Sequence, residues 1–197
     1  MYEEPVEDNP FLEPFYKDLK DSNFPSTAAY HLQVGFLGTR IGAHIAAQFM
    51  KFEAQLKAQQ KLPGKKGIVQ DRGLFEDRFV FAQMLNRDGI ISDRDFKAYC
   101  LFYDNFMKYI ENPDLVVYLR APLDIQIERI RKRGRKMELE MLKPGDDYLI
   151  RLGVAYNGWY ESYAGKKISL DSSTLDFANV PEDQRKLVEI VQRELAA

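Results

Sequence analysis

The sequence predicts an α/β fold in which a parallel sheet carries helices on both faces, formed as a single domain over residues 1–197. Two observations lead to this prediction. Short apolar stretches alternate with longer helical patterns, which is typical of strands joined by crossover helices. The clearest strand, residues 115–119 (LVVYL), is apolar at every position, which favours burial of both its faces. No internal repeat or linker divides the chain.

The individual elements follow from capping residues, turn residues and the spacing of apolar side chains. Residues 3–14 contain three prolines, which predict a loop with short turns. Ser26 and Thr27 are suitable N-caps for a helix that runs to about Lys61, since apolar side chains recur there every three or four residues. The other expected elements are strands at 67–71, 115–119 and 168–171 and helices at 75–87, 93–110, 122–133, 147–163 and 181–195.

Composition and charge exclude several classes of protein. A hydrophobic content of 45% and a charged content of 29% exclude a disordered chain. Cys100 is the single cysteine, and the two histidines lack the HExxH spacing, so neither a disulfide nor a zinc site is expected. The net charge of −2 disfavours nucleic-acid binding. Because no run spans a membrane and no secretory signal is present, we expect a cytoplasmic protein without a membrane partner.

Asp71 and Arg72 close the predicted strand at 67–71. In open α/β sheets ligands bind at the carboxyl ends of strands. A carboxylate at such a position can hold Mg²⁺, and a neighbouring arginine can meet a phosphate. A helix-capping aspartate beside a surface arginine is the alternative interpretation.

The positive charge of the chain is concentrated in residues 129–136, RIRKRGRK, where six of eight residues are cationic. These residues follow the best strand and its helix. Three interpretations stay open: a solvated helix end, a nucleic-acid patch, or a phosphate clamp formed by Arg129, Arg133 and Arg135 around Gly134.

Two further clusters are candidates for binding or catalysis. The acidic residues around Glu4 could supply a general base, or they could form an ordinary polar loop. Gln33 and Arg40 are seven residues apart and therefore share one helix face. A glutamine can make paired hydrogen bonds to a purine edge, although a buried polar pair is an equally good interpretation.

Six blocks of sequence, in order, resemble the deoxynucleoside kinases over nearly the whole chain. The blocks are EPVEDNP (4–10), FYKD (15–18), Gln33 with Arg40, DRGLFEDRFVFA (71–82), PDLVVYLR (113–120) and ERIRKRGR (128–135). The first block looks most like the bacterial deoxyadenosine/deoxyguanosine kinase-like branch. The resemblance implies a P-loop-kinase-like fold and transfer of the γ-phosphate of ATP to the 5′-hydroxyl of a deoxynucleoside, in nucleotide salvage. It also implies Mg²⁺ and a homodimer formed through long helices.

The resemblance assigns roles to individual residues. It makes Glu4 the general base, Asp71 a Mg²⁺-placing residue, and Arg72 a partner of Glu4 or of the phosphates. The remaining roles are base recognition by Gln33, Arg40 and Asp77, packing on the base by Leu32 and Phe81, contact with the sugar 3′-hydroxyl by Tyr16 and Glu138, and a phosphate lid of Arg129, Arg133 and Arg135. Arginines suit the last role because phosphoryl transfer is mainly positioning and charge stabilisation.

The sequence departs from the family in one major respect, since it contains no G-x-x-x-x-G-K-[ST] motif. The segment 63–67 (PGKKG) has the wrong spacing and precedes a strand. We therefore expect the first strand, P-loop and helix to be missing from this chain. A misplaced start, a pseudokinase and a strand supplied by a separate chain are the three explanations, and retention of Glu4, Asp71 and the lid arginines favours the first.

Two other functions remain as alternatives to a deoxynucleoside kinase. A nucleoside monophosphate kinase of the thymidylate kinase type shares the Asp-Arg strand end and the arginine lid. A non-catalytic nucleoside-binding or regulatory subunit fits the absence of a P-loop. The sequence does not determine which base is preferred.

Overall fold

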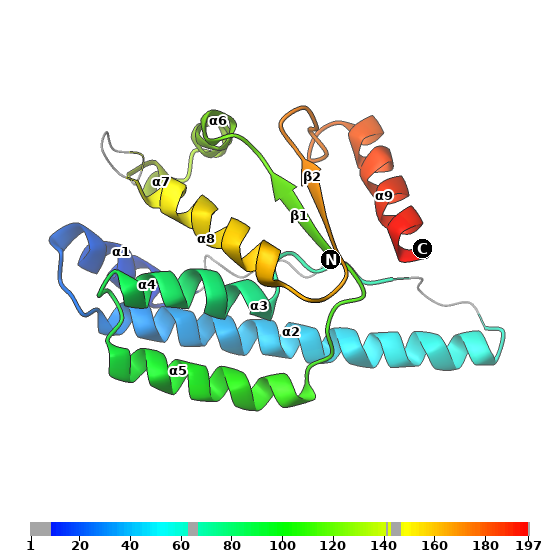
Figure 1. Ribbon diagram of the computed structural model, residues 1–197, viewed down its shortest axis with the longest axis horizontal. Helices are drawn as coiled ribbons and strands as arrows, with labels where there is room; N and C mark the ends of the chain where they lie inside the picture. Colours follow the sequence, from blue (N-terminus) through cyan, green and yellow to red (C-terminus); the bar gives the residue numbers. More distant parts are fainter. Residues whose placement is uncertain (1–8, 63–66, 141, 143–146, 197) are drawn as a thin grey trace. The chain divides into compact units, whose positions relative to one another are not determined.

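The computed structural model describes residues 9–62, 67–140, 142 and 147–196 (Figure 1). The chain divides into two compact units, Met1–Glu111 and Asn112–Ala197. The predicted general base Glu4 lies outside the described residues. In the part of the chain that is described, no helix is long and apolar enough to cross a membrane.

The first unit is built from helices. These are α1 (Leu12–Asp21), α2 (Thr27–Gln59), α3 (Leu74–Glu76), the π-helix η1 (Asp77–Ala82), α4 (Gln83–Arg87), α5 (Asp93–Phe106) and the 3₁₀ turn η2 (Met107–Tyr109). The two main helices begin at the predicted caps, because the Ser26 hydroxyl accepts a hydrogen bond from Ala29 N and the Ser92 hydroxyl accepts one from Asp95 N.

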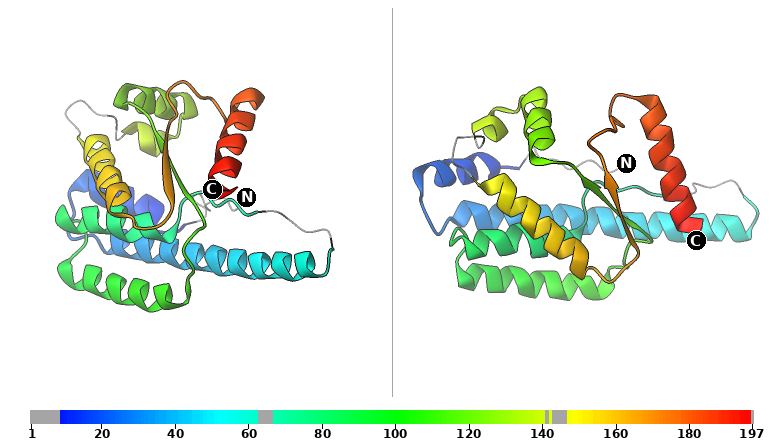
Figure 2. Two further views of the ribbon diagram at one scale, coloured as in Figure 1. Left: turned by 45° about the vertical axis from the view of Figure 1, so that its right-hand side comes forward. Right: turned by 45° about the horizontal axis from the view of Figure 1, so that its top comes forward.

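The core of the first unit forms where α2, α5 and the segment α3–α4 pack together (Figures 1 and 2). One cluster joins Leu37 and Ile41 of α2 to Leu74, Tyr99 and Tyr103. A second cluster, around Ala29 and Leu85, packs the beginning of α2 against α4. The apolar spacing that predicts α2 therefore also supplies its packing face.

Two predictions for the first unit are wrong. The loop predicted through residue 14 ends earlier, since α1 begins at Leu12 and contains Pro14. Proline is tolerated there because the first-turn N–H groups of a helix have no intrahelical acceptor. Residues 67–71 do not form a strand, and Gln70 makes a single bridge. A strand requires a paired neighbour along its length, and among the described residues the sheet consists of two strands that lie elsewhere.

The second unit contains a parallel two-stranded sheet and four helices among its described residues. Its elements are β1 (Val116–Arg120), α6 (Leu123–Arg133), α7 (Lys136–Glu140), α8 (Tyr148–Ser162), β2 (Lys167–Asp171) and α9 (Pro181–Ala196). Val116 pairs with Lys167, and the register continues to the pair Arg120 and Asp171. Within this unit α8 and α9 lie on opposite sides of the strands (Figures 1 and 2), which agrees with the predicted α/β fold.

The prediction that β1 is buried on both faces is wrong. Its side chains are half-buried or exposed, and Leu119 retains 39% of its accessible surface. The side of β1 that meets α8 is covered by aromatic rings, because Tyr118 stacks on Tyr156 with ring centroids 5.9 Å apart. In the described part of the chain the strand pairs with β2 alone, which leaves it as an edge.

Candidate functional site

A buried ion pair joins α2 to the π-helical turn. Arg40 of α2 and Asp77, the first residue of η1, contact each other through Nη1 and Oδ1, and their side chains are 7% and 1% exposed. The guanidinium of Arg40 also lies over the ring of Phe36, 5.2 Å from its centroid. Charges removed from water require such a partner, and each side chain of the pair supplies the counter-ion of the other.

The other predicted base-recognition residues gather on the same helix. Leu32 and Gln33 precede Arg40 by two turns and are 2% and 5% exposed. On the α5 side, Tyr99 is 1% exposed, and burial raises the pKa of its hydroxyl well above the ordinary value of 10.0. A neutral hydroxyl, an amide and an ion pair thus share a region that is otherwise apolar.

Asp71 and Arg72 lie in the turn that precedes α3. Both residues are exposed, and Arg72 has a left-handed backbone conformation with φ of 58°. The Arg72 guanidinium lies 5.2 Å from the centroid of the Phe81 ring, so this turn and η1 are in contact. Two predicted roles, phosphate contact and packing on the base, therefore belong to residues that touch each other.

The turn before α3 carries Asp71, the carboxylate predicted to place Mg²⁺. Magnesium sites commonly combine one or two carboxylates with phosphate oxygens. Glu76 is buried and its Oε1 accepts a hydrogen bond from Gly73 N at 2.7 Å, whereas Asp71 is exposed. Asp71 is therefore the described carboxylate of the turn that faces solvent. Among the described residues, no group of three acidic, histidine or cysteine side chains forms a complete metal site.

His44 connects α2 to this turn. It is 9% exposed, it meets Phe75 edge-on, and its side chain hydrogen-bonds to Gln70, the neighbour of Asp71. Burial lowers the pKa of His44 below 6.5, although the bond to Gln70 acts in the opposite direction. No local sequence pattern predicts this contact, because it joins residues far apart in the chain.

Tyr16, the predicted sugar contact of the first unit, lies on α1. Its side chain is half-buried, and its ring is 5.4 Å from that of Phe15. The helix that carries it packs on α2, which also carries Gln33 and Arg40. The first unit therefore contains the described residues predicted to contact the base and one of the two predicted to contact the sugar.

Two of the predicted lid arginines converge on one carboxylate in the second unit. Glu138 of α7 accepts hydrogen bonds from Arg133 Nε at 2.9 Å and Nη2 at 2.6 Å, and from Arg135 Nη1 at 3.4 Å. Gly134 ends α6 with φ of 73°, which allows the sharp reversal between the two arginines. The predicted sugar contact and two predicted phosphate contacts thus form one partly exposed cluster.

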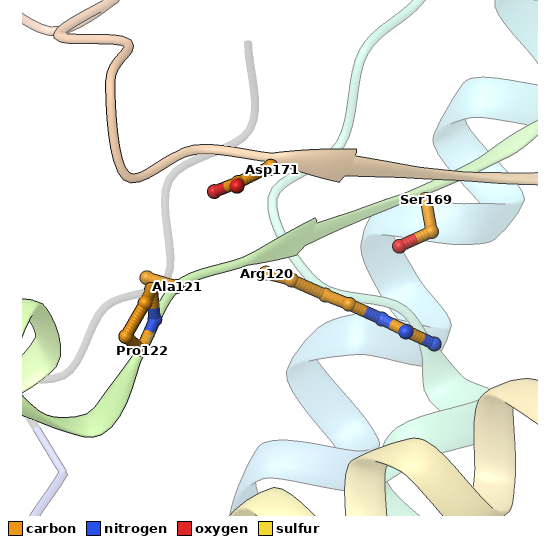
Figure 3. Close-up of a pocket in the computed structure, with 5 residues that line it drawn as sticks. All are labelled: Arg120, Ala121, Pro122, Ser169 and Asp171. Atoms are coloured by element: carbon orange, nitrogen blue, oxygen red, sulfur yellow. The ribbon is translucent and has the colours of Figure 1, made fainter.

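The third predicted lid arginine, Arg129, has different partners. It bonds to Ser172 and to Leu175 O, residues of the loop after β2 that sequence reasoning had not selected. This loop borders a cavity of about 460 Å³ at the carboxyl ends of the strands, lined by Arg120, Ala121, Pro122, Ser169 and Asp171 (Figure 3). Hydrogen bonds from Ser173 lower the pKa of Asp171, so its carboxylate stays ionised.

The sequence of the chain matches the model of one protein family. The family model for deoxynucleoside kinases matches residues 1–196. The chain belongs to the deoxynucleoside kinase family. This confirms the resemblance of the sequence blocks, and the helical unit and parallel strands are the family's α/β fold.

Curated relatives in the family are named as purine or pyrimidine deoxynucleoside kinases. The deoxyadenosine kinase of Dictyostelium discoideum is 34% identical over 160 residues, which are 81% of this chain and 54% of the relative. The deoxyadenosine kinase of Lactobacillus acidophilus is 30% identical over 98% of this chain and 82% of its own length. The deoxyadenosine/deoxycytidine kinase of Bacillus subtilis is 32% identical over 81% of this chain and 64% of its own length.

Solved deoxynucleoside kinase structures share the fold. A deoxyadenosine kinase from M. mycoides with the products dCMP and dCDP is 28% identical, with a TM-score of 0.67 over 97% of this chain and 85% of that protein. The same enzyme with bound dATP gives a TM-score of 0.64 over 100% of this chain and 86% of that protein.

Proposed function

We propose that the complete gene product containing this chain transfers the γ-phosphate of ATP to the 5′-hydroxyl of a deoxynucleoside. The observation that carries the proposal is the buried Arg40–Asp77 pair on the helix that also buries Gln33, two turns before Arg40. A nucleobase presents fixed donors and acceptors, and a rigid buried set of an amide and two opposite charges can match them. Membership of the deoxynucleoside kinase family supports the reaction class.

In this proposal the first unit holds the nucleoside. Gln33, Arg40 and Asp77 recognise the base edge, while Leu32 and Phe81 pack on its faces. Tyr16 holds the 3′-hydroxyl of the sugar, and the same role is proposed for Glu138. Arg40 and Asp77 are preorganised by their mutual contact, so little conformational entropy remains to be lost when the base binds.

The phosphate chemistry is assigned to charged residues. Glu4 is the proposed general base for the 5′-hydroxyl, and Asp71 helps to place Mg²⁺, which neutralises phosphate charge when bound. Arg72, Arg133 and Arg135 stabilise the charge that spreads over the transferred phosphoryl oxygens.

The test is a phosphorylation assay of the complete gene product with ATP, Mg²⁺ and each of the four deoxynucleosides. We expect a 5′-monophosphate product from at least one nucleoside, and a fall of at least ~100-fold in kcat for Glu4→Gln, since general-base catalysis contributes about 10²–10⁴-fold. Glu13→Gln, an exposed glutamate on α1, is the matched control and retains activity. Phosphorylation of deoxynucleoside monophosphates instead indicates the thymidylate kinase type, and nucleoside binding without turnover indicates a regulatory subunit.

We also propose a homodimer that uses the exposed apolar side chains of α2 and α5. These two helices pack against each other and leave large hydrophobic residues in solvent. The exposed residues on them are Ile45, Phe49, Phe52, Leu56, Leu101, Phe102 and Phe106. Clusters of this kind mark protein interfaces.

Light scattering of the purified gene product tests the dimer. We expect twice the protomer mass for the natural protein and the protomer mass for Phe49→Glu, because Phe49 is 70% exposed. Val154→Glu changes a residue that is 67% exposed on α8 and is the matched control, expected to leave the mass at the dimer value.

A further inference from the structure

We propose that Arg129 and Ser172 form a latch that fixes the loop after β2 at the carboxyl end of the sheet, and that both are positioning residues for the phosphate-donor nucleotide. The latch comprises the contacts of these two residues with the end of β1 and with Leu175. Its kinetic consequence rests on the proposed kinase function, whereas its structural part does not.

Ser172 is the centre of the latch. It is 2% exposed, which is unusual for a serine in a loop after a strand. Its backbone N–H and its hydroxyl both donate to the carbonyl oxygen of Arg120, the last residue of β1, at 2.7 Å and 2.8 Å. Because its N–H and its hydroxyl both bond to one carbonyl, this buried serine fixes the direction in which the chain leaves β2.

Arg129 closes the latch from α6. Its Nη1 donates to the Ser172 hydroxyl at 3.1 Å, and its Nη2 donates to the carbonyl of Ser172 and to that of Leu175 at 3.3 Å. The planar guanidinium is needed for this pattern because it presents several donors in a fixed fork. A lysine at the same position keeps the charge but has one nitrogen in place of the two that donate here.

The contacts of Arg129 differ from those of Arg133, one helical turn further along α6. Arg133 pairs with Glu138, a residue of α7, while Arg129 is directed to the loop after β2. The two arginines therefore have separate tasks. Arg133 keeps its proposed place in the lid, whereas Arg129, which the family resemblance also placed in the lid, is proposed here to shape the edge of the sheet.

The position of the latch indicates which ligand it affects. The latched loop begins directly after Asp171, which lines the cavity at the carboxyl ends of the strands together with Arg120 (Figure 3). Open α/β sheets bind nucleotides at this edge. The residues proposed for the acceptor base belong to α2 and η1 of the first unit, so we assign the latch to the donor nucleotide.

The structural part is tested by hydrogen–deuterium exchange of the complete gene product. Ser172→Ala removes both hydroxyl bonds, and we expect at least ~10-fold faster exchange in the peptide covering residues 171–176, since a 1.4 kcal/mol loss of protection corresponds to tenfold. Ser172→Thr keeps the hydroxyl and restores slow exchange. Ser162→Ala, whose hydroxyl bonds to Trp159 O at the end of α8, is the matched control. Unchanged protection in Ser172→Ala overturns the latch.

The kinetic part is tested on the same variants and on Arg129→Lys. We expect KM for ATP to rise about tenfold in Ser172→Ala and Arg129→Lys, with KM for the deoxynucleoside within twofold of the natural value. Ser172→Thr restores KM for ATP. A fall in kcat with both KM values unchanged, or an equal rise in both, overturns the positioning role. Absence of any kinase activity in the natural protein refutes the proposed function instead, and the exchange experiment still decides the latch.

Discussion

Arg40 and Asp77 form an ion pair across α2 and η1 with both side chains almost fully removed from solvent. Asp77 is the first residue of a π-helical turn, a geometry that often occurs at functional sites. The pair therefore combines a structural task, joining two helices, with the proposed recognition of the base. Variants can separate these tasks, because a substitution can restore the stability of the fold without restoring contact with the base.

Removing one partner of this pair is expected to destabilise the protein strongly. Arg40→Met leaves the Asp77 carboxylate buried without its counter-ion, and such a loss costs about 3–5 kcal/mol in the free energy of unfolding. The double variant Arg40→Met/Asp77→Leu recovers most of that stability because no isolated charge remains, while deoxynucleoside affinity stays lost. Urea titration measures the first quantity, and calorimetric titration with the preferred deoxynucleoside measures the second. Native affinity in the double variant refutes a role in base recognition.

The beginning of α2 depends on Ser26. The Ser26 hydroxyl accepts from Ala29 N at 2.9 Å and donates to Asp18 Oδ2 at 2.6 Å, and the residue is 3% exposed. Ser26→Ala is expected to lower the free energy of unfolding by about 1–2 kcal/mol, the usual cost of a lost N-cap. Thr39→Ala, which removes a hydroxyl from the exposed side of the same helix, is the control and changes stability less.

The same contact has a pH signature. Hydrogen bonds from Ser26 and then Asn23 lower the pKa of Asp18 from 3.8. A carboxyl whose folded pKa is depressed contributes stability above its unfolded pKa and loses it as pH falls through the folded value. The difference in urea midpoint between the natural protein and Ser26→Ala is therefore largest at neutral pH and shrinks below pH 3.8. A difference that grows on acidification contradicts this account.

His44 gives a second pH dependence at a higher pH. Because burial lowers its pKa below 6.5, the unfolded chain binds a proton more readily than the folded one. Its contribution is complete above pH 6.5 and decreases as pH falls through the interval between 6.5 and the lower folded pKa. His44→Gln is expected to reduce the pH dependence of the urea midpoint in that interval. His31→Gln, which alters the exposed histidine of the same helix, is the matched control for the loss of an imidazole.

The cluster of Arg133 and Glu138 is expected to matter for turnover and little for stability. The side chains are 51% and 25% exposed, and exposed ion pairs contribute about 0–1 kcal/mol to folding. Arg133→Gln therefore keeps the urea midpoint close to that of the natural protein while kcat falls by at least ~10-fold, because its guanidinium no longer stabilises the transferred phosphate. Arg185→Gln, in an exposed pair with Glu182 on α9, is the control for both measurements. Equal kcat in the two variants excludes Arg133 from the lid.

The sequence predicted the features that depend on neighbouring residues. The limits of α2 follow from the Ser26 cap and from apolar side chains every three or four positions, and both signals act within a few turns. The apolar run at 115–119 and the segment at 168–171 likewise indicated the two strands. Gln33 and Arg40 could be placed on one helix face by their spacing, and the motifs they belong to identified the family.

Tertiary structure decided which distant residues meet. The spacing of Arg40 says nothing about Asp77, and nothing near Ser172 indicates that Arg129, 43 residues earlier, completes its hydrogen bonds. The segment at 67–71 has the composition of a strand but becomes one only if a neighbouring strand accepts its backbone groups. Local signals fix helix ends and faces because their causes lie within one or two turns, whereas pairing and burial depend on chain segments that folding brings together.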